Sequence, residues 1–95
     1  ILMKLLSVKK STSKGKKFMA LFDKNGEEKL VHFGATGYLD YTIGATDKQR
    51  RLYRIRHSSG ENAPPDTPNA LSYHILWNTT SRTKNIELYK KKYNV

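Results

Sequence analysis

Basic side chains provide most of the chemistry that this sequence offers. The 95 residues include 18 Lys and Arg against eight Asp and Glu, which gives a formal net charge of +10. All but two of the basic residues fall in three stretches, 1–17, 46–57 and 82–93, which contain only two of the acids. Clustered Lys and Arg neutralise phosphates and release the counterions around a nucleic acid. The sequence therefore favours a polyanionic partner, above all the phosphate backbone of a nucleic acid.

The candidate contacts combine two kinds of hydrogen-bond donor. The guanidinium groups of Arg50 and Arg54 could each bind a phosphate with two parallel hydrogen bonds, whereas lysines act as point charges. No helix-turn-helix, zinc-finger or basic-zipper pattern is present, so we expect contact with double-stranded DNA that depends little on base sequence. The predicted nucleic-acid-binding residues are Lys9, Lys10, Lys14, Lys16, Lys17, Lys48, Arg50, Arg51, Arg54, His57, Lys84, Lys90 and Lys91.

Two other interpretations of the charge stay open. The chain could be an interaction module that docks on an acidic host or viral protein, or the basic surface could simply be solvated. Tyr38 and Tyr41 lie near glycines and could stack exposed bases, as in single-strand binders. Aromatic residues next to a strand are more often part of the core, and we favour that role for both tyrosines.

Catalysis finds little support in the sequence. His32, His57 and His74 are far apart in the chain, and a nuclease-like set of His57 or His74 with Asn78 and Asp40 lacks any metal-ligand spacing. The absence of cysteine excludes disulfides and thiolate metal sites. The segment 34–37 lacks the spacing of a phosphate-binding loop and is expected to form a tight turn. We expect no enzyme activity, no cofactor, no metal and no small-molecule substrate.

The first 16 residues are expected to form a basic arm or an extra strand next to a single compact domain of residues 17–95. The segment Ser7–Lys17 is rich in Ser, Thr, Gly and Lys and resembles a flexible arm that becomes ordered on contact. The apolar residues 1–8 could instead form a strand that pairs with the following hairpin or with another chain, or a short interfacial membrane anchor. We favour the strand. Nothing in the sequence is long and apolar enough to span a membrane, or to be the core of a signal peptide.

Periodicity then predicts the elements that position these residues. Phe18, Ala20 and Phe22 alternate in a strand, residues 23–26 offer turn chemistry, and 29–33 form the returning strand. The segment 34–43 is either a loop or a loop that leads into a third short strand.

Three helices are expected after this hairpin. Thr46 and Gln49 have the spacing of a capping box for a helix over 47–58, whose residues Leu52, Tyr53 and Ile55 would reach the core. A mostly apolar helix would follow over 68–77, with Thr67 as its cap and Pro68 at its first position. The last helix would run from the cap Ser81 to about 93, with an inner stripe of Ile86, Tyr89 and Tyr93.

Several runs of residues are also similar to those of a viral protein family. The run from His32 to Thr42 (HFGATGYLDYT) resembles the signature of small, basic, uncharacterised proteins encoded by nucleocytoplasmic large DNA viruses, the giant viruses. The family also has a basic helix that ends in Arg-His, an "ILWN" block and a final Lys-rich helix, which match residues 53–57, 75–78 and 82–93. The resemblance covers about residues 17–93. The Pro-rich loop 58–68 departs from the pattern, and the residues before 17 lie outside it.

The resemblance implies a viral origin and a compact α+β domain, but no activity or catalytic residue that could be transferred. We therefore expect an α+β fold, with an N-terminal antiparallel hairpin or small sheet followed by two or three short helices. The expected function is non-enzymatic binding of DNA, in the virion or in the interior of the infected cell (cytoplasm or nucleus), without secretion. Two copies in a homodimer would double the charged surface.

Overall fold

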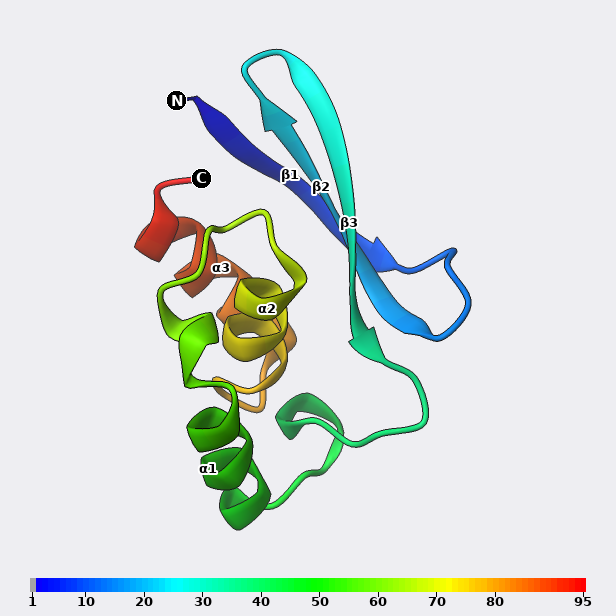
Figure 1. Ribbon diagram of the computed structural model, residues 1–95, viewed down its shortest axis with the longest axis vertical. Helices are drawn as coiled ribbons and strands as arrows, with labels where there is room; N and C mark the ends of the chain where they lie inside the picture. The colour runs from blue at the N-terminus through cyan, green and yellow to red at the C-terminus, as the bar shows by residue number, and fades with distance from the viewer. Residues whose placement is uncertain (1) are drawn as a thin grey trace.

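The computed structural model describes residues 2–95 and shows an antiparallel sheet followed by helices (Figure 1). The sheet has three strands in the order β1 (Met3–Lys10), β2 (Lys16–Lys24) and β3 (Glu27–Ala35). The two longer helices are α1 (Asp47–Arg56) and α3 (Arg82–Tyr93). Between them, the short helix α2 (Pro68–Leu71) continues directly as the π-helical segment η3 (Ser72–Leu76). Two short 3-10 helices are η1 (Tyr41–Ile43) and η2 (Ser58–Glu61). The α+β architecture expected from the sequence is confirmed.

The β2–β3 hairpin forms where alternation and turn chemistry predicted it. Asn25 and Gly26 both have positive φ, 55° and 88°, which is the conformation that a two-residue hairpin turn requires. The pairing places Phe18 opposite Phe33 and Ala20 opposite Val31. Alternate residues of both strands therefore point to one face of the sheet, and that face lies against the helices.

The N-terminal segment is a strand rather than a flexible arm, which corrects one of the two expectations for it. Met3–Lys10 pairs with β2 in antiparallel register, and Leu5 is buried in the core. A β-bulge between Leu5 and Ser7 accommodates one extra residue in this strand. The expectation of flexibility from Ser7 to Lys17 failed because β2 offers a free edge, and the backbone of the segment satisfies its hydrogen bonds there.

The segment after β3 forms a loop and the 3-10 turn η1, not the further strand that was one of the two expectations for 34–43. Asp40 caps this turn by accepting a hydrogen bond from the Thr42 amide. The caps predicted for the following helices are present. Thr46 and Gln49 form the reciprocal capping box of α1, Thr67 accepts from the Ala70 amide, and Ser81 accepts from the Lys84 amide.

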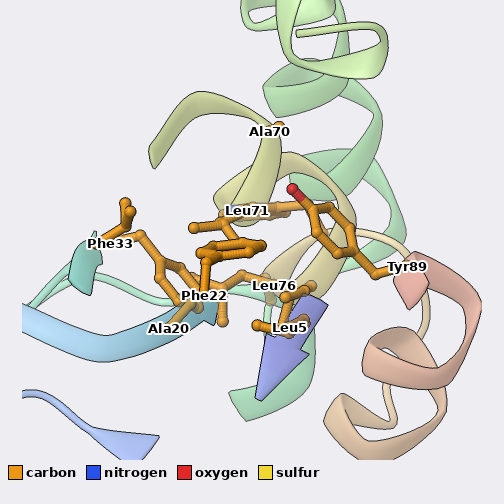
Figure 2. Packing of buried hydrophobic residues seen from close by; sticks show 12 residues of the cluster. Leu5, Ala20, Phe22, Phe33, Ala70, Leu71, Leu76 and Tyr89 are labelled. Carbon is orange, nitrogen blue, oxygen red and sulfur yellow. The ribbon is translucent and has the colours of Figure 1, made fainter. Parts of the chain in front are cut away.

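The core lies between the helical layer and one face of the sheet (Figure 2). Phe22 and Phe33 from the sheet meet Leu71 and Leu76 from the α2–η3 segment, and all four are almost completely buried. Tyr89 of α3 is also buried, and its hydroxyl donates to the Pro65 carbonyl. Burial raises the pKa of Tyr89, so the phenol stays a neutral donor. The prediction that residues 68–77 belong to the core is confirmed.

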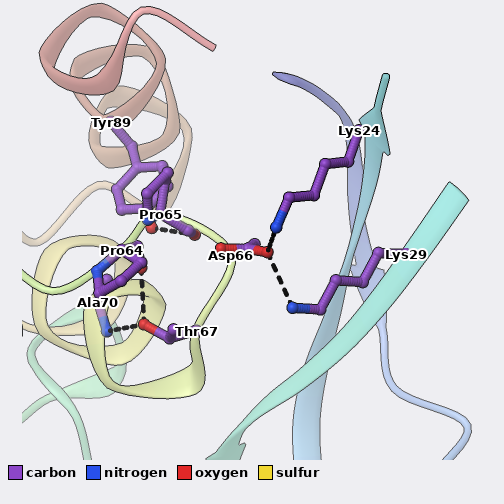
Figure 3. Close-up of polar contacts among 8 residues, drawn as sticks. All are labelled: Lys24, Lys29, Pro64, Pro65, Asp66, Thr67, Ala70 and Tyr89. Atoms are coloured by element: carbon purple, nitrogen blue, oxygen red, sulfur yellow. Dashed lines mark hydrogen bonds and ion pairs between the residues drawn. The ribbon is translucent and has the colours of Figure 1, made fainter. Parts of the chain in front are cut away.

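Asp66 joins the loop before α2 to the hairpin (Figure 3). This carboxylate is 6% exposed and lies 2.8 Å from Lys29 Nζ and 3.3 Å from Lys24 Nζ. The hydrogen bond from Lys29 is the main cause that lowers the pKa of Asp66 below its ordinary value of 3.8. The two lysines outside the three basic stretches therefore hold the two layers of the fold together.

Candidate nucleic-acid interface

A groove of about 710 Å³ lies at the end of the sheet where β1 ends and β2 begins. Its walls come from residues 8–10 of β1, residues 16–18 of β2, the loop 36–40, Ile43 and Arg82 at the start of α3. We call the exposed basic residues in and next to this groove the basic rim. They are Lys9, Lys10, Lys14, Lys16 and Arg82.

The turn between β1 and β2 fixes the lysines of the rim. Gly15 takes a positive φ of 85°, and the Lys16 amide donates to the Ser13 carbonyl. The Thr36 amide donates to the Gly15 carbonyl, which ties the end of β3 to the same turn. A hydrogen bond of 2.7 Å between Ser11 Oγ and His32 Nδ1 connects the turn to the middle of the sheet. Four of the predicted contact residues, Lys9, Lys10, Lys14 and Lys16, are thus brought together on an ordered element.

Arg82 joins this cluster from the other layer of the fold. Its guanidinium carbon lies 4.5 Å from the centre of the Phe18 ring, which is a cation–π contact. Phe18 packs in turn against Phe33, with ring centres 6.0 Å apart. Arg82 was absent from the predicted contacts, because its proximity to the rim depends on the packing of α3 against the sheet.

Lys17, which was also predicted as a phosphate contact, lines the groove but is largely buried and paired with an acid. Its Nζ lies 2.7 Å from Asp40 Oδ2, and the two side chains are 13% and 2% exposed. Asp40 is the single acidic residue among those that line the groove, and Lys17 neutralises it. The pair also fixes the loop 36–40 to β2.

Tyr38 and its neighbours in that loop are exposed instead of buried. Tyr38 is 73% exposed, and Leu39 and Ile43 are each more than half exposed. The core role favoured for Tyr38 is therefore wrong, because the loop borders two grooves and leaves its ring open to solvent. Tyr41 is half-buried, donates a 2.6 Å hydrogen bond to Asp47 Oδ1 and lies under the Arg50 guanidinium.

Helix α1 is rotated with respect to its expected orientation. Leu52 and Ile55, which were expected to reach the core, are exposed, while Tyr53 is half-buried and stacks on Trp77 with ring centres 4.3 Å apart. Arg50 Nε donates to the Asn78 carbonyl, and Arg54 donates to the Trp77 carbonyl.

A cation–π contact with Tyr73 also holds Arg54, whose guanidinium carbon lies 4.2 Å from the centre of the Tyr73 ring. Arg50 and Arg54 were predicted as bidentate phosphate ligands, and the structure instead engages them within the fold. They satisfy backbone carbonyls at the end of η3, a need that the sequence of α1 alone does not reveal.

The other predicted contacts are exposed, and all of them except Lys84 lie on other parts of the surface than the rim. Lys48 and Arg51 are on α1, and Lys90 and Lys91 are on the last turn of α3. In Figure 1, α1 and the end of α3 lie on the left, whereas the β1–β2 turn lies on the right. Lys84 is in the first turn of α3, two residues from Arg82. His57 ends α1 and stacks on Tyr53. The structure therefore divides the predicted set into the rim and several separate positions.

A second groove, of about 780 Å³, lies on the other side of the loop that carries Tyr38 and Leu39. Its lining is mixed and includes Trp77, Arg56 and His57. Tyr38 and Lys16 line both grooves, so the loop 36–40 forms a ridge between them.

The histidines do not assemble a catalytic set. His74 and Asn78 line a small cavity of about 320 Å³, whereas Asp40 is in the ion pair with Lys17. His74 Nε2 donates to the Glu61 carbonyl, and burial lowers the pKa of His74 below its ordinary value of 6.5. Within residues 2–95, no three His, Cys, Asp or Glu side chains are placed to hold a metal ion. None of the helices in this range has both the length and the apolar character needed to cross a bilayer.

Comparison with known proteins supports the viral resemblance. The chain is 38% identical to the uncharacterised protein L851 of Acanthamoeba polyphaga mimivirus over 80 residues, which cover 76% of this chain and 80% of the relative. No solved structure matches the chain. A model of the family of unknown function DUF5754 matches residues 6–57, from β1 through α1. The match includes the β1–β2 turn, which we expected to lie outside the shared region. The chain therefore belongs to the DUF5754 family and has a giant-virus relative.

Proposed function

We propose that this protein is a non-enzymatic viral DNA-binding protein that contacts the phosphate backbone with little sequence preference. The observation that carries the proposal is the basic rim: Lys9, Lys10, Lys16 and Arg82 line one groove, and Lys14 lies in the adjoining β1–β2 turn. Within residues 2–95, the acidic residue that lines this groove, Asp40, is already neutralised by Lys17. Association with the genome or the virion inside the infected cell would suit such a protein.

The physical reason is the release of counterions. Each phosphate that is neutralised on duplex DNA lowers the slope of log K against log salt by about 0.9. Five contacts from the rim would give a slope of about −4.5, so affinity would fall about 500-fold between 50 and 200 mM salt. Lysines bind phosphates as point charges and carry no base information, which is the basis for proposing little sequence preference.

A salt titration of binding to mixed-sequence duplex DNA tests the proposal, with single-stranded DNA and double-stranded RNA measured in parallel. We expect binding at low salt that weakens with the steep slope given above and varies little between duplex sequences. The relative affinities identify the preferred polymer. An absence of binding to all three polymers at low salt would contradict the proposal.

The alternative is an interaction module for an acidic host or viral protein. The apolar residues Leu39 and Ile43, which also line the groove, favour it because a protein interface needs an apolar anchor. The two functions differ in their dependence on salt. A defined protein partner would stay bound at salt concentrations that release DNA, and Leu39→Ala would weaken the protein complex more than the DNA complex.

The further proposal of a homodimer rests on the face of the sheet that the helices leave uncovered. Leu21 and Leu30 lie opposite each other on this face, and Leu30 is 47% exposed. A two-fold axis through this pair would pack the same leucines of two copies against each other. Such a dimer would present two basic rims and could bridge two duplexes.

A further inference from the structure

We propose that the groove also holds an unpaired nucleobase, which stacks on the ring of Tyr38 while the adjoining phosphates lie on the basic rim. This inference rests on the proposed function and specifies which structure of DNA the protein binds. The ligand would be DNA that carries unpaired bases, such as a duplex with a single-stranded gap.

The first argument is the environment of Tyr38 compared with that of the other tyrosines. The other five each have an aromatic or cationic side chain against the ring; they are Tyr41, Tyr53, Tyr73, Tyr89 and Tyr93. Within residues 2–95, Tyr38 alone of the six has neither, and it is 73% exposed in a groove wall. A large ring that is left open to solvent next to cationic side chains is the arrangement with which single-strand binders stack bases.

The second argument is that the backbone on both sides of Tyr38 is fixed. Two residues before Tyr38, the Thr36 amide donates to the Gly15 carbonyl. Two residues after it, Asp40 is in the buried ion pair with Lys17 and caps η1. The backbone part of the ordering cost is therefore already met by the fold before any ligand binds, and only the Tyr38 side chain has to be fixed.

Arg82 provides a second stacking surface in the same groove. Its guanidinium carbon lies 4.5 Å from the centre of the Phe18 ring, and this contact helps to keep the group at the groove. Guanidinium planes and aromatic rings are the two surfaces on which proteins stack unpaired bases. The groove volume of about 710 Å³ lies within the range of about 300–1,000 Å³ that is typical of sites for small organic groups.

The experiment compares binding of the full chain to two DNAs of equal length at one salt concentration. One is an intact duplex, and the other carries a short single-stranded gap with 2-aminopurine, whose fluorescence reports base stacking. We expect about 5- to 150-fold tighter binding of the gapped DNA, from the contribution of about 1–3 kcal/mol per stacked base. Tyr38→Ala should remove this preference, whereas Tyr38→Phe should keep it.

Ile55→Ala is the matched control, because Ile55 is 65% exposed on α1 and lines neither groove. It should leave the preference for gapped DNA unchanged. A preference that survives Tyr38→Ala would overturn the inference, and so would equal binding of both DNAs by the unmodified chain. In those cases salt-dependent binding of the intact duplex would still support the proposed function. Failure to bind either DNA at low salt would overturn both.

Discussion

Lys17 and Asp40 form an ion pair between β2 and the loop that carries Tyr38, with 2.7 Å between Nζ and Oδ2. Asp40 is 2% exposed at its side chain and also accepts hydrogen bonds from the amide and hydroxyl of Thr42. The Asp40 carboxylate therefore fixes the path of the loop. Its pairing with Lys17 also neutralises its negative charge at the groove wall. The ligand site that we propose depends on this pair.

Replacing Asp40 by Asn should destabilise the fold. The amide can still cap η1 through its oxygen, but Lys17 would keep a largely buried charge without its partner. Loss of one member of a buried pair costs about 3–5 kcal/mol, and we expect about 3 kcal/mol because Lys17 is 13% exposed. Urea unfolding measures this loss. A change in the free energy of unfolding below about 0.5 kcal/mol would show that the pair does not hold the loop.

Arg54 and Arg51 offer a matched comparison on one helix. Arg54→Ala removes a hydrogen bond to the Trp77 carbonyl and the cation–π contact with Tyr73. We expect it to lower the free energy of unfolding by about 1–3 kcal/mol. Arg51 is exposed, so Arg51→Ala should change stability by less than about 0.5 kcal/mol. Equal effects of the two substitutions in chemical denaturation would mean that Arg54 is a surface residue after all.

Arg50 and Arg54 also show where prediction from sequence stopped. Local signals were sufficient for the hairpin turn at Asn25-Gly26 and for the caps at Thr46 and Ser81, because each acts within a few residues. The rotation of α1 was not predictable in this way. Its sequence offers both an apolar stripe and an arginine stripe, and the backbone carbonyls of residues 77 and 78 select the arginines.

The candidate site was predictable in part for the same reason. The lysines of residues 9–16 stood out by composition, and the turn between β1 and β2 brings them together. The contribution of Arg82 depends on its contact with Phe18, which is more than 40 residues away in the sequence. The exposure of Tyr38 depends on the direction of its loop. Neither feature leaves a signal in the local sequence.

The stability of the protein should depend on pH through His74. Burial lowers the pKa of His74 in the folded state below 6.5, so the unfolded chain binds a proton more readily there. The contribution of His74 to stability is full above about pH 6.5, declines as pH falls below that value, and is lost below the pKa of the folded state. His74→Gln should flatten the stability profile between pH 6.5 and pH 5, as followed by urea unfolding. An identical slope in the variant would contradict the assignment.

The dimer proposal predicts a change in mass with a substitution on the uncovered sheet face. Leu30→Glu would place one carboxylate from each copy, two like charges in all, at the centre of the proposed dimer contact, whereas in a monomer the single new carboxylate would face solvent. We expect sedimentation velocity to show a dimer for the unmodified chain and a monomer for Leu30→Glu. A monomer for the unmodified chain at high protein concentration would exclude this contact.

The most direct test of the central claim is the salt dependence of duplex binding by two variants of equal charge. One replaces Lys10, Lys14 and Lys16 of the rim by Gln, and the other replaces Lys48, Lys90 and Lys91 on the helices. If the rim contacts phosphates, the first variant should lower the magnitude of the slope of log K against log salt by about 2.7, and the second should change it much less. Equal changes in slope, or no change in the rim variant, would contradict the account.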